Sequence, residues 1–134
     1  MSISFPFKEY PSSVFGKIRR PVAEVFFQSK NSKFWQSVTM LVDTGADYTL
    51  LPRFLAKSLG IVLIKDCKAI HTSGVGGSSK VYMLKKKIRV KIGNYQRKVP
   101  VGFLEGDDIP PLLGREEFLE TFKVTFNNFT TTFE

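Results

Sequence analysis

The sequence predicts a single domain of mostly β structure with one or two short helices. Apolar and polar residues alternate in several short segments, and this period of two residues is typical of strands with one buried face. Glycine, proline and asparagine residues, which favour turns, separate these segments. The length of 134 residues suits one domain, and a hydrophobic content of 43%, with thirteen phenylalanines, is enough for an ordered core.

The predicted strands form a series of hairpins along the chain. In each hairpin, a polar or glycine-containing turn joins two segments of β-forming residues. The predicted hairpins are 22–27 with 34–42, 69–83 folded back on itself near 73–79, 88–92 with 99–103, and 122–126 with 129–133. Leu112 and Leu113 are expected to form one more short strand, which ends at Gly114.

Two short helical segments are expected between the strands. Pro52 is expected to begin one over 53–59, and Gly60 to end it, because proline suits the first turn of a helix and glycine the position after the last. Residues 116–121 are expected to form one or two helical turns. The sequence shows no linker, no low-complexity stretch and no internal repeat.

The cysteine and histidine counts exclude several classes of site. The single cysteine, Cys67, rules out a disulfide within the chain, and the single histidine, His71, is too few for most zinc sites. A Ser-His-Asp or Cys-His mechanism would depend on His71 alone. We interpret Cys67 as a partly buried, inert thiol and His71 as an exposed strand residue. We therefore expect no metal ion and no cofactor.

The net charge of +8 raises the question of a nucleic-acid partner. The cations concentrate in 17–20 and 80–98, and from 85 to 92 they alternate with apolar residues, as in a strand with one face in water. A solvated face explains this pattern better than a surface that attracts acidic partners. A basic nucleic-acid-binding barrel is a third-ranked hypothesis without a base-stacking aromatic motif in its favour, so no nucleic acid is expected.

The apolar residues of the sequence do not form the pattern of a membrane span or of a secretory signal. No apolar run approaches the roughly 20 residues that are needed to span a bilayer. The start of the chain, from Met1 to Phe7, lacks the basic-then-apolar order of a secretory signal. We therefore expect a soluble, cytoplasmic protein that has no membrane partner.

The triplet Asp43-Thr44-Gly45 places an acid between an apolar strand and a glycine. Such an acid leaves the core at a turn, where glycine allows either a close approach of the backbone or a positive φ. The simple alternative is a structural loop in which Asp43 accepts backbone hydrogen bonds. Three features favour a functional site: apolar residues on both sides of the triplet, the glycine-rich segment 73–79, and the segment Leu112-Leu113-Gly114-Arg115 near the end.

With these features the chain resembles the retropepsin-like aspartic proteases over residues 22–133. The resemblance implies a closed β-barrel, the acid protease fold, with a flap hairpin that covers a bound peptide. Residues 21–134 would form this domain, preceded by an N-terminal extension, 1–20, of unknown role. Because 5–15 is apolar and extended enough to lie in a cleft, an inhibitory pro-segment is one hypothesis for the extension.

The resemblance also implies roles for individual residues. Asp43 would be the catalytic carboxylate, and Thr44 would form a hydrogen bond across a dimer that braces the two active-site loops. Asp47 would form an ion pair with Arg115 beneath the catalytic loop. The residues expected to support this loop are Thr44, Gly45, Ala46, Asp47, Leu113, Gly114 and Arg115, and those expected in the substrate-binding flap are Ser73, Gly74, Val75, Gly76 and Gly77.

The single Asp-Thr-Gly triplet has a consequence for the mechanism. Peptide hydrolysis of this type uses two carboxylates that share one proton, because two like charges a few ångströms apart do not both ionise easily. The ionised carboxylate takes a proton from the attacking water, and the protonated one donates to the scissile carbonyl. One chain carries one such aspartate, Asp43, so the pair must come from two subunits, and a symmetric homodimer provides it.

We therefore expect a homodimeric aspartic endopeptidase that acts on a peptide or protein substrate, mainly between apolar side chains. The alternative is a non-catalytic dimeric peptide-binding or assembly domain on the same fold. The polar flap tip and the N-terminal extension leave room for this alternative. Two departures from the family's pattern bear on how a substrate would be bound. The segment Gly77-Ser78-Ser79 has no bulky apolar side chain with which a flap grips substrate, and Tyr48 stands where several viral enzymes have a second acid.

Overall fold

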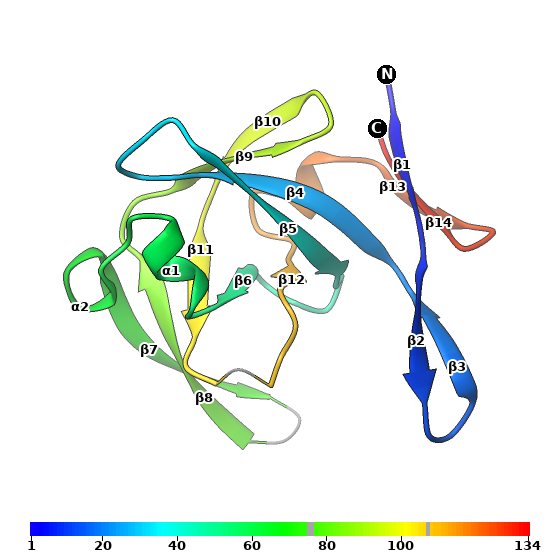
Figure 1. Ribbon diagram of the computed structural model, residues 1–134, viewed down its shortest axis with the longest axis horizontal. Coiled ribbons are helices and arrows are strands. Elements are labelled where there is room, and N and C mark those ends of the chain that lie inside the picture. The colour runs from blue at the N-terminus through cyan, green and yellow to red at the C-terminus, as the bar shows by residue number, and fades with distance from the viewer. Residues whose placement is uncertain (75–76, 107) are drawn as a thin grey trace.

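The computed structural model describes residues 1–74, 77–106 and 108–134, and β-strands dominate it (Figure 1). The helices are α1 (Leu55–Ser58), α2 (Leu63–Asp66) and one 3₁₀ turn, η1 (Leu119–Thr121). The strands are β1 (Ile3–Pro6), β2 (Lys8–Ser12), β3 (Gly16–Arg20), β4 (Val22–Gln28), β5 (Trp35–Val42), β6 (Thr49–Pro52), β7 (Cys67–Gly74), β8 (Gly77–Leu84), β9 (Ile88–Ile92), β10 (Tyr95–Val99), β11 (Val101–Leu104), β12 (Leu112–Leu113), β13 (Val124–Asn127) and β14 (Thr130–Phe133).

Nine of the strands form one curled sheet, in the order β10-β9-β4-β5-β12-β6-β11-β8-β7 (Figure 1). The mostly β, barrel-like fold expected from the sequence is confirmed. Most neighbours are antiparallel, but β12 lies parallel to β5 and β11 lies parallel to β6. These two parallel pairs join segments that are distant in the sequence, and one of them places Leu113 beside Val42, the residue before Asp43.

The apolar residues of the alternating segments fill the interior of this sheet. In β4, for example, Val25 and Phe27 are fully buried, whereas Glu24, the residue before Val25, is exposed. The same alternation in β9 buries Val90 and exposes Arg89. The largest fully buried side chains are Phe27, Phe103, Phe118, Phe133, Met40, Leu51, Leu59, Ile92 and Leu113. β4 and β9 therefore each have one face in the core, as the period of two residues predicts.

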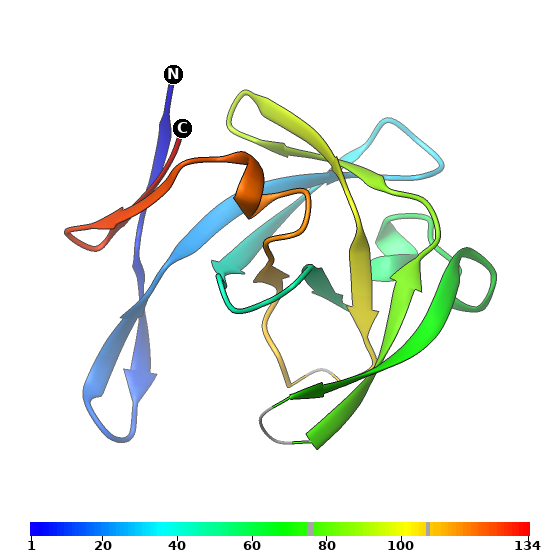
Figure 2. The ribbon, with the colours of Figure 1, turned by 180° about the vertical axis from the view of Figure 1, so that it is seen from behind.

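The first twenty residues form strands that the sequence did not predict. β1 pairs with β14, so the start of the chain lies beside its end in the three-stranded sheet β1-β14-β13. Phe5 of β1 packs edge-on against the buried ring of Phe133, with 6.0 Å between ring centres. β2 and β3 form a separate hairpin that extends away from the barrel, with Val14 and Phe15 exposed at its tip (Figures 1 and 2).

One predicted strand pairing is wrong. β9 does turn at Gly93, as expected, but its partner is β10 (Tyr95–Val99) and not 99–103. Pro100 has no N–H to donate, so it separates β10 from β11, which pairs with β6 and β8 instead. The long polar side chains of β10 concealed its alternation from an argument based on apolar residues.

The helices also differ in detail from the expected ones. Pro52 is the last residue of β6 and does not begin a helix, whereas Gly60, with φ of 72°, does end the turn after α1 as predicted. Residues 116–121 contain only the 3₁₀ turn η1, and α2 was not predicted. No helix in the described part of the chain is long and apolar enough to cross a membrane.

The ion pair between Lys30 and Asp66 predicts how stability changes with pH. Lys30 donates to one carboxylate oxygen of Asp66 and the Val62 N–H donates to the other, at 2.8 Å. The hydrogen bond from Lys30, followed by that from Val62, lowers the pKa of Asp66 below its ordinary 3.8. A lowered pKa in the folded chain means that these bonds stabilise the fold above about pH 4 and lose this effect as the pH falls below that value.

We therefore expect Asp66→Asn to lower the thermal unfolding midpoint at pH 7, and to lower it less at pH 3, because pH 3 lies below the ordinary carboxyl pKa of 3.8. Thermal unfolding followed by circular dichroism at both pH values checks this result. Glu24→Gln serves as the control, because Glu24 is exposed on β4. An equal loss for Asp66→Asn at both pH values would contradict the assignment.

Candidate active site

Asp43 leaves the core at the end of β5, where backbone bonds fix the chain on both sides. The N–H of Val42 donates to the carbonyl of Pro21 (2.9 Å), and that of Asp43 donates to the carbonyl of Leu113 (3.1 Å). Val42 is buried and Asp43 is half-buried. The carboxylate therefore stands at the boundary between the core and the surface, on a backbone held by β12 and by the residue before β4.

One carboxylate oxygen of Asp43 is held within the loop. Oδ1 accepts a hydrogen bond from the N–H of Gly45 (2.9 Å), and the carbonyl of Asp43 accepts one from the N–H of Ala46 (3.2 Å). Among the described residues, the structure shows no hydrogen bond to Oδ2. The simple structural interpretation, in which Asp43 serves only to accept backbone hydrogen bonds, accounts for one of its two carboxylate oxygens.

Gly45 is needed for close approach and not for a special backbone angle. The φ of Gly45 is not positive, unlike that of Gly16, Gly60 and Gly93. A Cβ built on Gly45 would lie 3.3 Å from Oδ1 of Asp43, which is tighter than ordinary van der Waals contact. Of the two reasons for a glycine that the sequence left open, the structure therefore selects the close approach.

The predicted ion pair between Asp47 and Arg115 is confirmed. Nη2 of Arg115 lies 2.6 Å from Oδ1 of Asp47, and Nη1 of the same guanidinium donates to the carbonyl of Thr44 (2.9 Å). The planar guanidinium thus joins two points of the loop that follows Asp43. Backbone bonds reinforce this contact, since the N–H of Arg115 donates to the carbonyl of Ala46 (3.0 Å).

Leu113 and Gly114 lie directly under the loop, as the resemblance implied. Leu113 is fully buried, and the Gly114 N–H donates to the hydroxyl of Thr49 (3.2 Å), which is also fully buried. A Cβ on Gly114 would overlap the backbone carbonyl group of Tyr48. Only glycine therefore allows the two segments to approach this closely. The sequence did not predict that the Thr49 hydroxyl would accept this hydrogen bond, because Thr49 is there only a polar residue before Leu50.

The predicted flap corresponds to the hairpin of β7 and β8. In the described part, Ser73 pairs with Ser78 and Gly74 pairs with Gly77, while Val75 and Gly76 lie outside the described residues. Figures 1 and 2 show this hairpin extending from the barrel, with the loop between β5 and β6 lying in projection between it and the β2–β3 hairpin. The assignment of 73–77 to substrate binding stays a prediction.

The remaining candidate side chains lie elsewhere. Cys67 is buried at the start of β7, and burial, followed by the nearby Asp66 carboxylate, raises the pKa of its thiol. A raised pKa disfavours the reactive thiolate, which agrees with the interpretation of an inert cysteine. His71 is exposed on β7. Within the described residues, no group of three or more His, Cys, Asp or Glu side chains is arranged to hold a metal ion.

Comparisons with known proteins agree with this geometry. The family described as Aspartyl protease matches residues 31–116, which is more than half of the chain and includes the Asp43 loop and the Arg115 contact. No curated protein sequence matches the chain. Among solved structures, a retropepsin-like aspartic protease from Rickettsia conorii matches with a TM-score of 0.68 and 23% identity, over 98% of each chain. The chain therefore has a retropepsin-like fold and belongs to the aspartyl protease family.

Proposed function

We propose that the chain is an aspartic endopeptidase in which Asp43 activates water for the hydrolysis of a peptide bond. The observation that supports this most strongly is the state of the Asp43 carboxylate. One of its oxygens is fixed by the Gly45 N–H, and no bond to the other is found among the described residues. A carboxylate that is held at one oxygen and open at the other is suited to bind a water and take its proton.

The second carboxylate of the reaction is proposed to come from a second copy of the chain. The other acid of the same loop, Asp47, is engaged by Arg115 and so is not free to share a proton with Asp43. A twofold axis between two subunits would place one Asp43 opposite the other. The side chain of Thr44 is exposed while its carbonyl is held by Arg115, which leaves the hydroxyl available to the partner's loop.

In the proposed reaction, the ionised member of the Asp43 pair takes a proton from water as the oxygen of that water attacks the peptide carbonyl carbon. The protonated member donates its proton to the carbonyl oxygen, giving a tetrahedral intermediate with no covalent bond to the enzyme. Collapse of this intermediate breaks the C–N bond, and a proton moves to the leaving nitrogen. The products are a free carboxyl group and a free amine, and the pair of carboxylates again shares one proton.

The β7–β8 hairpin is proposed to cover the substrate. An extended peptide can add to such a hairpin by backbone hydrogen bonds, as an extra strand does at the edge of a sheet, and β7 is an edge strand of the nine-stranded sheet. The exposed backbone groups of this edge then contribute binding that does not depend on the substrate's side chains. Apolar preference on either side of the cut remains a proposal that cleavage-site profiling would test.

The experiment that tests the proposed function is incubation of the purified protein with a mixed peptide library between about pH 4 and 7. Mass spectrometry identifies the products, and analytical ultracentrifugation measures the association state in the same buffer. Cleavage by a dimer supports the proposal. A well-folded dimer that binds peptides without cleaving them would favour the alternative of a binding or assembly domain.

We expect Gly45→Ala to reduce activity while the protein stays folded. The new methyl group would crowd Oδ1 of Asp43, from which the Cβ position lies only 3.3 Å. Moving a reacting group by a fraction of an ångström is expected to lower kcat by about tenfold or more. Steady-state kinetics and a thermal unfolding curve check this, with Gly106→Ala as the control because a Cβ there meets nothing within 4 Å. Unchanged kcat would contradict the close approach.

A further inference from the structure

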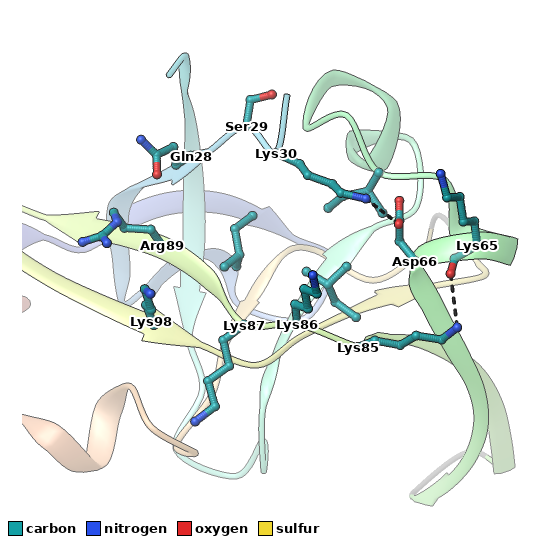
Figure 3. Close-up of a pocket in the computed structure, with 13 residues that line it drawn as sticks. Gln28, Ser29, Lys30, Lys65, Asp66, Lys85, Lys86, Lys87, Arg89 and Lys98 are labelled. Atoms are coloured by element: carbon teal, nitrogen blue, oxygen red, sulfur yellow. Dashed lines mark hydrogen bonds and ion pairs between the residues drawn. The ribbon is translucent and has the colours of Figure 1, made fainter. Parts of the chain in front are cut away.

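A basic pocket lies at the far end of β4 from the Asp43 loop. Its volume is about 580 Å³, and its walls come from the end of β4, from α2, from the segment between β8 and β9, and from β9 and β10 (Figure 3). Val22, at the other end of β4, pairs with Leu41 near Asp43. Seven residues of strand span roughly 20 Å at about 3.3 Å per residue, so this pocket is separate from the candidate active site.

The lining of the basic pocket is strongly unbalanced in charge. Asp66 is its one acidic residue, and both of its oxygens are already occupied, by Lys30 and by the N–H of Val62. Lys87 pairs with Glu117, which does not line the pocket. The cationic residues of the lining are Lys30, Lys65, Lys85, Lys86, Lys87, Arg89 and Lys98. Within the part of the chain that the structure describes, five of these seven make no salt bridge.

The alternation of a solvated strand does not explain this cluster. Only Arg89 belongs to the alternating part of β9, whereas Lys85, Lys86 and Lys87 precede that strand and the others come from three further segments. The fold therefore gathers cations from distant parts of the sequence into one hollow. Like charges around a concave, poorly polarisable surface reinforce one another and attract anions.

We propose that the basic pocket binds a small organic compound that carries two or more phosphate groups. Lysine ammonium groups bind phosphates as point charges and need no fixed planar geometry. The volume lies within the range of roughly 300–1,000 Å³ that is typical of small-molecule sites. The apolar side chains of Ile61, Leu84 and Ile88 also line the pocket, and they offer a surface for the uncharged part of such a compound.

The shape and composition of the basic pocket favour a compact ligand over a macromolecule. Its lining contains no aromatic residue, so it lacks the stacking surfaces on which single-stranded nucleic acids are bound. A flat anionic membrane or a rigid duplex would contact the rim of a hollow and leave its interior unfilled. A phosphorylated compound of nucleotide size can instead enter the hollow and meet cations from several sides.

The test uses the full chain with ATP and inorganic triphosphate as probes, measured by isothermal titration calorimetry and by thermal unfolding. Lys86→Glu with Lys98→Glu is the pocket variant, because both residues are exposed and neither makes a salt bridge or side-chain hydrogen bond in the described structure. Lys8→Glu with Lys17→Glu, on the β2–β3 hairpin, is the control with the same change in net charge.

We expect both probes to bind the wild type and to raise its unfolding midpoint. The pocket variant is expected to bind at least about tenfold more weakly and the control to bind like the wild type, because attraction to a few clustered charges falls steeply with distance in salt, over about 10 Å at 0.1 M. Equal loss in both variants would show a general effect of net charge and overturn the proposal.

A second outcome would also overturn the proposal. If a single-stranded DNA oligonucleotide or phosphatidylglycerol vesicles bind to the protein and excess triphosphate does not displace them, the basic surface belongs to a macromolecular partner. The measurements do not require peptidase activity, so the result is independent of the proposed function. Loss of peptidase activity with intact phosphate binding, or the reverse, separates the two proposals.

Discussion

Asp43→Asn is expected to lower the rate of peptide cleavage by about 10³-fold or more and to leave the fold unchanged. An amide cannot take the proton from water, and acid–base steps of this kind contribute roughly 10²–10⁴-fold in rate. The fold is expected to survive because the asparagine Oδ1 can still accept the hydrogen bond from the Gly45 N–H. Cleavage of the library peptides by wild type and variant, at equal protein concentration, measures the loss.

The control for Asp43→Asn is Glu24→Gln, which makes the same chemical change on the exposed face of β4. Unfolding curves and sedimentation of all three proteins show whether fold and association state are kept. If the Asp43→Asn protein still cleaves the peptides at a rate near that of wild type, Asp43 is not the catalytic carboxylate. If the variant associates only in part, the comparison is made with the associated fraction isolated by gel filtration.

Gly114→Ala has the largest expected effect on stability. The new Cβ would overlap the backbone carbonyl group of Tyr48, and backbone atoms cannot rotate away as a flexible side chain does. Overpacking of this kind costs about 3 kcal/mol, which for a chain of this length lowers the unfolding midpoint by roughly 10 °C. Separation of β12 from the loop would also strain the hydrogen bonds from Gly114 to Thr49 and from Arg115 to Ala46.

Thermal unfolding of Gly114→Ala and Gly106→Ala measures this effect. Both changes add one methyl group to a glycine whose φ is not positive, but nothing lies within 4 Å of a Cβ at Gly106. The control is therefore expected to unfold close to the wild-type temperature. Similar midpoints for all three proteins would mean that the Tyr48 and Gly114 segments are not held together as closely as the structure indicates.

The parts of the fold that the sequence predicted are those in which apolar alternation and turn residues coincide. β4 and β5 met both conditions, as did β9 with its turn at Gly93, and the structure contains them. β10 failed the first condition because its outer residues are long and polar. The pairing of β11 with β6 could not be predicted, because a parallel contact between distant segments produces no local pattern in the sequence of either segment.

The N-terminal strands show the same limit. β1 is short, contains Pro6 and is completed only by β14, which lies at the other end of the chain. Its position depends on long-range contacts such as the packing of Phe5 on Phe133, and no property of the first seven residues alone requires them. The division between an extension, 1–20, and a domain, 21–134, stays a prediction.

The residues of the candidate site could be predicted where they belong to a recognisable sequence motif. Asp43 and Gly45 follow from the triplet, and the Asp47–Arg115 contact followed from the resemblance. The contribution of Thr49 was not predictable, because a buried hydroxyl that accepts from Gly114 is recognised only when β6 and β12 are placed side by side. The residues of a contact between two chains are harder still to predict from the sequence, because the partner surface of a twofold contact is a second copy of the same chain.

The most direct test of the central claim is to mix wild type with Asp43→Asn at constant total protein concentration and to measure peptide cleavage after the subunits have exchanged. If each active site needs Asp43 from both subunits, an equal mixture holds two intact carboxylates in about one quarter of its dimers, and activity falls to about one quarter. A fall to about one half, in proportion to the wild-type fraction, would mean that each chain carries a complete site and would contradict the shared pair.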